Sequence, residues 1–140
     1  MIALLTTGRI PAGQKSMASL LIVEDEDNIR KFVTTNLTAR GFEVVEAGDA
    51  ETGLEQLRKN PPEVLVLDIR LPGMSGWDLL QIMADEVALS KVPVIVMTAS
   101  VTNLKFGTPS YPNVVQWLVK PVSVHELIQA VRRAISQTEN

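Results

Sequence analysis

Residues 64–76 read VLVLDIRLPGMSG: four apolar residues run into Asp68, and a turn rich in Pro, Gly and Ser follows. A continuous apolar run of this length predicts a strand that is buried on both faces, as in a parallel sheet. Open α/β sheets bind their ligands at the carboxyl ends of the strands. Asp68 is therefore a candidate reactive group that a rigid strand holds at this edge.

Three further apolar runs end on polar residues in the same way: 20–23 before Glu24-Asp25, 92–97 before Thr98-Ala99, and 114–119 before Lys120-Pro121. If the four run ends meet at one edge of a sheet, they supply three carboxylates, a hydroxyl and an ammonium. This set suits a divalent cation and a phosphoryl group, because Mg²⁺ prefers one or two carboxylates together with phosphate oxygens.

In order and spacing, these residues resemble the receiver domain of two-component response regulators. The match comprises Glu24-Asp25, Asp68, Thr98-Ala99 and Lys120-Pro121, and it extends across residues 18–138. The resemblance implies a flavodoxin-like fold, in which a doubly wound parallel sheet of five strands in the order 2-1-3-4-5 carries helices on both faces.

The rest of the chain alternates between strand and helix patterns. We expect strands at 19–23, 43–47, 63–67, 92–97 and 114–119. We expect helices at 27–40, from the cap Asp49 to Asn60, at 75–87, and after a capping box formed by Ser123 and Glu126. Strands interleaved with helices are typical of a doubly wound parallel sheet.

The segment 100–113 departs from the family, which has its fourth helix here. Gly107, Pro109 and Pro112 do not fit inside one long helix, because each proline costs roughly 3 kcal/mol there. We therefore expect a short fourth helix or a loop, and the partner surface that this helix forms in the family does not carry over.

The resemblance assigns Asp68 as the phosphoacceptor and Mg²⁺ as the cofactor, with Mn²⁺ as the alternative. It implies that Asp25 and Asp68 bind the metal directly, that Glu24 reaches it through water, and that the backbone carbonyl of Arg70 completes the site. The crowding of three carboxylates should raise the pKa of at least one of them.

Four further positions have roles that the resemblance implies. Lys120 would pair with a phosphoryl oxygen, Thr98 would donate its hydroxyl, and Ala99 would donate its backbone N–H. The Lys120–Pro121 bond is expected to be cis. Trp117 stands at the position of the switch aromatic residue, and simple packing is the alternative for it.

Composition excludes several other functions. The chain has 140 residues, no cysteine, one histidine and a net charge of −3. Disulfides, thiol catalysis and His-rich metal sites are therefore excluded, and the charge gives no general reason to bind nucleic acid. No apolar run approaches 18 residues, so we expect no membrane span and a cytoplasmic protein.

We expect residues 1–17 to be a flexible N-terminal extension and residues 18–138 to form the receiver domain, with no output domain. The expected partners are a histidine kinase or a phosphotransfer protein, and a downstream protein that the sequence does not name. Direct nucleic-acid binding is not expected, and a homodimer stays open.

Two alternatives compete with a phosphorylated switch. A degenerate receiver would bind a partner without phosphorylation, but Asp25, Asp68, Thr98 and Lys120 are all present. An aspartate-nucleophile phosphatase of the haloacid dehalogenase type would need a second acid two residues after the nucleophile. Arg70 stands at that position. We therefore expect a signalling domain that catalyses only its own phosphorylation and dephosphorylation.

Overall fold

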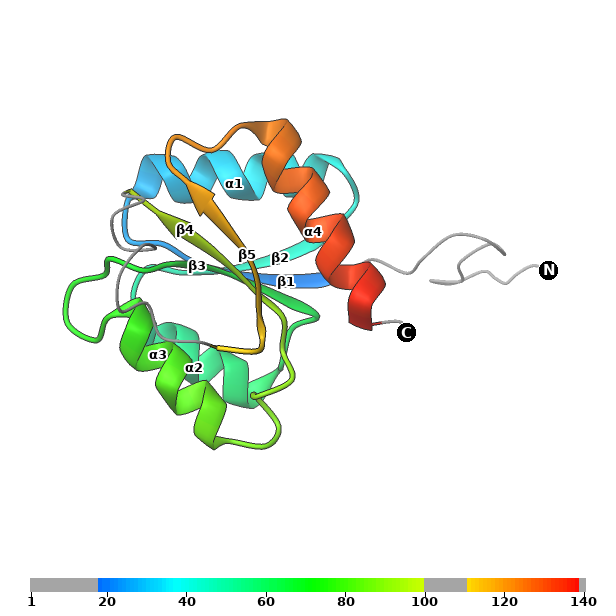
Figure 1. Cartoon of the computed structure of the whole chain (residues 1–140). Helices are drawn as coiled ribbons and strands as arrows, with labels where there is room; N and C mark the ends of the chain where they lie inside the picture. The colour runs from blue at the N-terminus through cyan, green and yellow to red at the C-terminus, as the bar shows by residue number, and fades with distance from the viewer. Residues whose placement is uncertain (1–17, 100–110, 139–140) are drawn as a thin grey trace.

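A computed structural model describes residues 18–99 and 111–138 of the chain. Five parallel strands form one sheet in the order β2-β1-β3-β4-β5 (Figure 1), which confirms the expected flavodoxin-like topology. The strands are β1 (Ser19–Val23), β2 (Glu43–Ala47), β3 (Val64–Asp68), β4 (Val94–Thr98) and β5 (Val114–Val119). The expected extension 1–17 lies outside the described residues.

In the part of the chain that the structure describes, four helices cover the two faces of the sheet: α1 (Asp27–Ala39), α2 (Ala50–Lys59), α3 (Gly76–Asp85) and α4 (Val124–Thr138). Helices α1 and α4 lie on one face, and α2 and α3 lie on the other (Figure 1). Within the described ranges, no helix lies between β4 and β5. The predicted fourth-helix segment falls largely on residues 100–110, outside those ranges, so α4 here is the last helix.

Local side-chain chemistry sets the helix ends. The Asp49 carboxylate accepts a hydrogen bond from the Thr52 amide at 2.7 Å, as expected for an N-cap. Ser123 and Glu126 form the predicted capping box, with the Glu126 amide 3.1 Å from the Ser123 hydroxyl oxygen. Helix α1 ends at Ala39, and Gly41 just beyond it has a φ of +90°, a value that suits a residue without Cβ.

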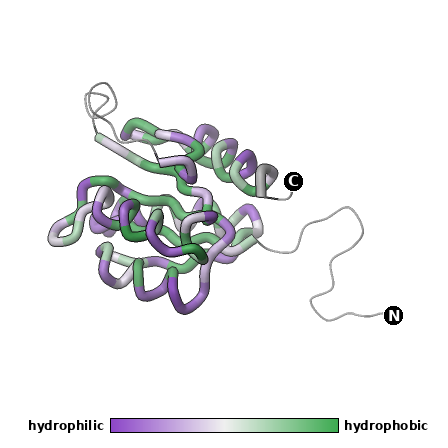
Figure 2. Tube along the Cα trace, turned by 60° about the horizontal axis from the view of Figure 1, so that its bottom comes forward, coloured by the Kyte–Doolittle hydropathy of each residue, from purple (hydrophilic) through white to green (hydrophobic). Residues whose placement is uncertain are grey.

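The core consists of two apolar clusters, one on each face of the sheet. Every residue of β3 and β4 is buried, which explains why their sequences read as continuous apolar runs. The helices instead alternate between hydrophobic and hydrophilic residues along the chain (Figure 2). Hydrophobic burial therefore fixes the central strands, whose carboxyl ends carry the polar residues.

Gly76 brings the start of α3 against the end of β3. A Cβ at this position would lie 2.7 Å from the Ile69 Cα and 2.8 Å from the Asp68 carbonyl oxygen. Both atoms belong to the backbone, so neither can rotate away. The absence of a side chain at residue 76 therefore lets α3 pack directly beneath the strand end that holds Asp68.

Several predicted bounds differ from the structure: β3 is Val64–Asp68 and not 63–67, and β4 is Val94–Thr98 and not 92–97. Helix α3 ends at Asp85 and not at Val87, since Glu86 already has an extended backbone. Phe32 of α1 is 41% exposed and borders a groove between α1 and the turn after β5. No helix in the described ranges combines the length and apolarity needed to cross a bilayer.

Candidate functional site

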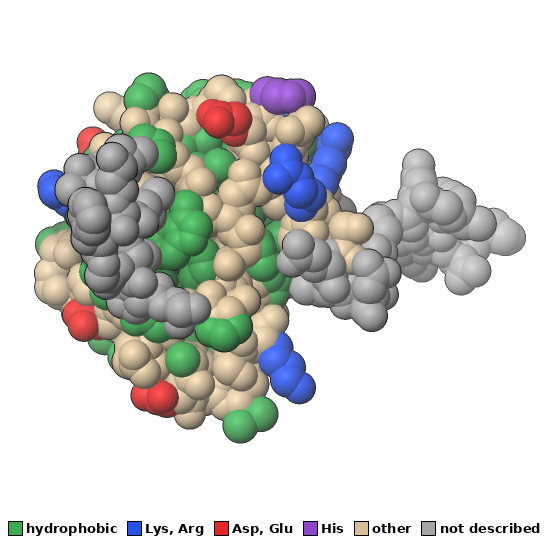
Figure 3. Space-filling model, viewed as in Figure 1, with side chains coloured by type: hydrophobic (Ala, Val, Ile, Leu, Met, Phe, Trp, Pro, Cys, Tyr) green, Lys and Arg blue, Asp and Glu red, His purple; other side chains and the backbone are tan. Residues whose placement is uncertain are grey.

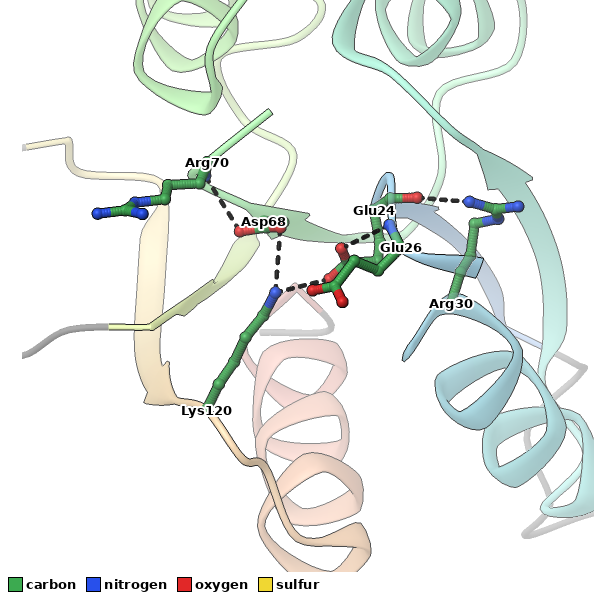
Figure 4. Close-up of polar contacts among 6 residues, drawn as sticks. All are labelled: Glu24, Glu26, Arg30, Asp68, Arg70 and Lys120. Carbon is green, nitrogen blue, oxygen red and sulfur yellow. Dashed lines mark hydrogen bonds and ion pairs between the residues drawn. The ribbon is translucent and has the colours of Figure 1, made fainter. Parts of the chain in front are cut away.

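Strand ends at the carboxyl edge of the sheet bring Glu24, Asp68 and Lys120 together (Figure 4). Asp68 is the last residue of β3, while Glu24 and Lys120 directly follow β1 and β5. The Lys120 amide donates to the Thr98 carbonyl at 2.8 Å, so backbone pairing extends past the last strand residues. The prediction that the run ends meet at one edge is therefore correct for these residues.

The Lys120 ammonium bridges two buried carboxylates. Its Nζ lies 3.0 Å from Glu24 Oε1 and 3.1 Å from Asp68 Oδ2. The side chains of Glu24 and Asp68 are 0% and 4% exposed, and that of Lys120 is 16% exposed. Burial of a carboxylate is costly unless a cation and hydrogen bonds compensate it. The ammonium provides that compensation for both acids.

The second oxygen of Asp68 is also held. Asp68 Oδ1 accepts a hydrogen bond from the backbone amide of Arg70 at 3.0 Å. The chain therefore turns directly after β3 and fixes the carboxylate plane at both oxygens. The Arg70 side chain is exposed.

Asp25 completes an acidic cluster with Glu24 and Asp68. One ligand oxygen from each of the three carboxylates lies within 4.8 Å of the others. Asp25 is exposed, whereas the other two acids are buried, so the cluster is open on one side. A set of carboxylate oxygens fits a hard divalent cation such as Mg²⁺ or Mn²⁺.

Burial perturbs the protonation of this cluster. It raises the pKa of Glu24 from 4.5 to about 7, although hydrogen bonds from Lys120 and from the Glu26 amide oppose the rise. Burial also lowers the pKa of Lys120, but hydrogen bonds to Glu24 and Asp68 outweigh it and leave that pKa above its ordinary value. A raised carboxyl pKa was predicted from charge crowding. Burial is the larger cause, and the charge of Asp68 is a smaller one.

The remaining predicted residues lie around this centre. Thr98, the last residue of β4, is 1% exposed, while Ala99 beside it is exposed. The Lys120–Pro121 peptide bond is cis, as predicted. The single histidine, His125, lies on the surface of α4 (Figure 3).

Trp117 of β5 packs towards α3. Its ring centroid lies 5.8 Å from that of Trp77, and the Trp77 ring lies 6.3 Å from that of Tyr111. Trp77 in turn borders an open cleft of about 580 Å³, together with Asp25 and Arg70. The sequence analysis did not predict the contact between Trp77 and Trp117.

Sequence reasoning also passed over Arg30. This α1 residue donates to the backbone carbonyl of Glu24 at 2.7 Å and pairs with Asp27, three positions earlier on the helix. The i, i+3 spacing of opposite charges was a visible signal for the pair with Asp27. It gave no indication of the bond to the loop that carries the acidic cluster.

Comparisons with known proteins agree with this geometry. The response regulator receiver domain family matches residues 20–132. The chain is 34% identical to the "Probable transcriptional regulator ycf27" of Cyanophora paradoxa, over 86% of this chain and 49% of that relative. It is also 34% identical to the "Sensory transduction protein RegX3" of Mycolicibacterium smegmatis, over 85% of this chain and 51% of that relative. It thus spans about half the length of the curated relatives that it matches.

The fold of this chain also resembles solved structures of response regulators. A putative response regulator from Chloroflexus aurantiacus superposes with a TM-score of 0.78 at 27% identity, over 86% of this chain and 98% of that one. The chemotaxis response regulator CheY4 of Vibrio cholerae superposes with a TM-score of 0.77 at 26% identity, over 84% and 98%. The strand order, the acidic cluster beside Lys120 and these matches lead to one conclusion: the chain belongs to the response regulator receiver domain family of two-component signalling.

Proposed function

We propose that this chain is a phospho-accepting switch, which takes a phosphoryl group onto Asp68 from the phosphohistidine of a histidine kinase or a phosphotransfer protein. One observation carries the proposal. Asp68 ends a fully buried strand with both oxygens held, beside the Lys120 ammonium and two further carboxylates. A helix cap or a turn former would need neither the ammonium nor the second and third acids.

The transfer requires an in-line displacement at phosphorus. A carboxylate oxygen of Asp68 forms the new O–P bond while the P–N bond to the imidazole breaks, and the electron pair of that bond stays on the ring nitrogen. Most of the catalysis in such a transfer is positioning and neutralisation of charge. The strand end and the Arg70 amide supply the positioning, since they orient the Asp68 carboxylate before a donor arrives.

Glu24, Asp25 and Asp68 would hold Mg²⁺, with the backbone carbonyl of Arg70 as a further ligand. When bound, the ion would neutralise charge shared by the carboxylates and the phosphoryl oxygens. Lys120 would pair with one phosphoryl oxygen, which suits a compact ammonium. Thr98 would donate its hydroxyl to another, and Ala99 its backbone N–H.

We further propose that Trp117 reports the phosphorylated state. A phosphoryl group on Asp68 would draw the Thr98 side chain towards it and change the space beside β5, where Trp117 lies one strand away. The ring contact between Trp117 and Trp77 links that space to the cleft that Asp25 and Arg70 line. The output of the domain would then be a changed protein-binding surface. The name of one longer relative describes that protein as a probable transcriptional regulator.

Mg²⁺ should stabilise the fold. An ion that binds only the native state adds about 2.7 kcal/mol when its concentration is a hundred times its dissociation constant. We expect millimolar Mg²⁺ to raise the melting temperature by several degrees, and the rise to disappear in Asp25→Asn. Differential scanning calorimetry with and without EDTA measures this. If Mg²⁺ does not change the melting temperature of the parent protein, the proposed metal site is wrong.

Asp68 should be the only carboxylate that accepts the phosphoryl group. Acetyl phosphate with Mg²⁺ should add one phosphoryl group, seen by intact mass, and Asp68→Asn should abolish it. The same change at the exposed Asp85 on α3 should leave labelling intact. Labelling that persists in Asp68→Asn would place the acceptor elsewhere. A parent that accepts no phosphoryl group would favour the degenerate receiver.

The raised pKa of Glu24 should make the metal-free fold less stable at high pH. Between about pH 4.5 and pH 7 the folded state holds a proton that the unfolded state has lost, so the stabilisation is complete below pH 4.5 and disappears as pH rises through 7. In EDTA, Glu24→Gln should remove this dependence, a difference on the order of 3 kcal/mol between pH 4 and pH 8. Urea unfolding at both values tests it, with the exposed Glu55→Gln as the control. Parallel pH profiles for all three proteins would contradict it.

Beryllofluoride, a phosphoryl mimic, should change the emission of Trp117. We expect the change in a Trp77→Phe background, which isolates the second indole, and not when Asp68→Asn is added. Steady-state fluorescence at saturating beryllofluoride measures it. If Trp117 emission is the same with and without the mimic, the switch role fails while phosphoacceptance stands.

A further inference from the structure

Arg30 joins three elements at the base of the acidic cluster. From α1, its Nη1 donates to the Glu24 backbone carbonyl at 2.7 Å and its Nη2 lies 2.6 Å from Asp27 Oδ1. Its Nε donates to Glu46 Oε1 on β2 at 3.0 Å. Figure 4 shows the guanidinium directed at the Glu24 carbonyl, on the side of β1 away from Lys120. One side chain thus links the helix, the loop after β1 and the neighbouring strand.

The bond to Glu24 fixes one particular peptide plane. The Glu24 carbonyl belongs to the peptide bond that joins Glu24 to Asp25. The Glu24 amide is itself held, since it donates to the Ala47 carbonyl at 3.1 Å. With the amide bound to β2 and the carbonyl bound to Arg30, the backbone cannot rotate freely where it enters Asp25.

Asp25 needs such support more than the other two acids. Glu24 and Asp68 are buried and bind Lys120, whereas Asp25 is exposed at the open side of the cluster. The direction of its Cα–Cβ bond therefore depends on the backbone that carries it. Groups that orient metal ligands from behind contribute strongly to metal affinity.

Surface stabilisation alone is the simpler role for an arginine, and the contacts argue against it. An exposed ion pair contributes little, and Asp27 is 74% exposed. The Arg30 side chain, however, is only 17% exposed. A planar guanidinium can serve three acceptors in a fixed arrangement, which a lysine ammonium on a flexible stem cannot reproduce.

We propose that Arg30 is a positioning residue for the metal site: by holding the Glu24–Asp25 peptide, it presents the Asp25 carboxylate to the cation. The inference rests on the proposed function, since it supposes that Mg²⁺ binds the acidic cluster. In this role, Arg30 of α1 supports the metal site without contact with the metal or the phosphoryl group.

The test compares the whole chain with two variants. Arg30→Met keeps the apolar stem and removes all three contacts, and Arg30→Lys keeps the charge without the planar fork. We expect Arg30→Met to weaken Mg²⁺ binding about tenfold, the range seen for groups behind metal ligands. Arg30→Lys should weaken it in the same direction. Isothermal titration calorimetry with Mg²⁺ measures both.

A second measurement separates positioning from folding. With acetyl phosphate as donor, the Mg²⁺ concentration for half-maximal labelling of Arg30→Met should rise by the same factor as its dissociation constant for Mg²⁺. At saturating Mg²⁺, the labelling rate of Arg30→Met should equal that of the parent. Arg58→Met is the matched control. It removes the ion pair between Arg58 of α2 and Glu86, which lies outside the acidic cluster. Its Mg²⁺ affinity should equal that of the parent.

The outcomes distinguish the two proposals. A parent that binds no Mg²⁺ overturns the proposed metal site and this inference together. A parent that binds Mg²⁺, with Arg30→Met binding it equally well, overturns this inference alone, even if the variant melts at a lower temperature in EDTA. If Arg30→Met does not fold, Arg30→Lys decides, and parent-like affinity in that variant overturns the positioning role.

Discussion

The Lys120 ammonium lies between two carboxylates that a protein interior would otherwise not accept. Glu24 directly follows β1 and Asp68 ends the adjacent strand β3, and each loses its hydration on folding. Removing a charge from water costs several kcal/mol unless a counter-charge and hydrogen bonds replace the water. Lys120 provides the counter-charge, and the amides of Glu26 and Arg70 provide hydrogen bonds. The carboxyl edge of the sheet can therefore be both buried and acidic.

The sequence predicted the parts of the site that burial determines. The apolar runs before Glu24, Asp68 and Lys120 locate the strand ends, because a strand buried on both faces has to be apolar throughout. The contacts that it did not predict join residues far apart in the chain. Examples are the ion pair between Arg58 of α2 and Glu86, just beyond α3, and the ring contact between Trp117 and Trp77. Such contacts follow from how helices pack on the sheet, which local patterns do not specify.

The site combines a rigid interior with one open side. Asp68 is held at both oxygens, and Gly76 lets α3 pack against the backbone beneath it. Asp25 instead faces the open cleft that Arg70 and Trp77 also line. This division suits phosphoryl transfer, because the acceptor must be preorganised while the donor and the cation must be able to enter and leave.

The separation of the charged residues along the chain has a consequence for biosynthesis. Lys120 lies 96 residues after Glu24 and 52 after Asp68, so contacts of high sequence separation assemble the site. Such contacts form late in folding, since long loops must close first. On the ribosome, both acids emerge before Lys120, so a nascent chain that ends before β5 lacks the ammonium that compensates the burial of these carboxylates. Burial of both carboxylates in this arrangement therefore requires β5, the strand that Lys120 directly follows.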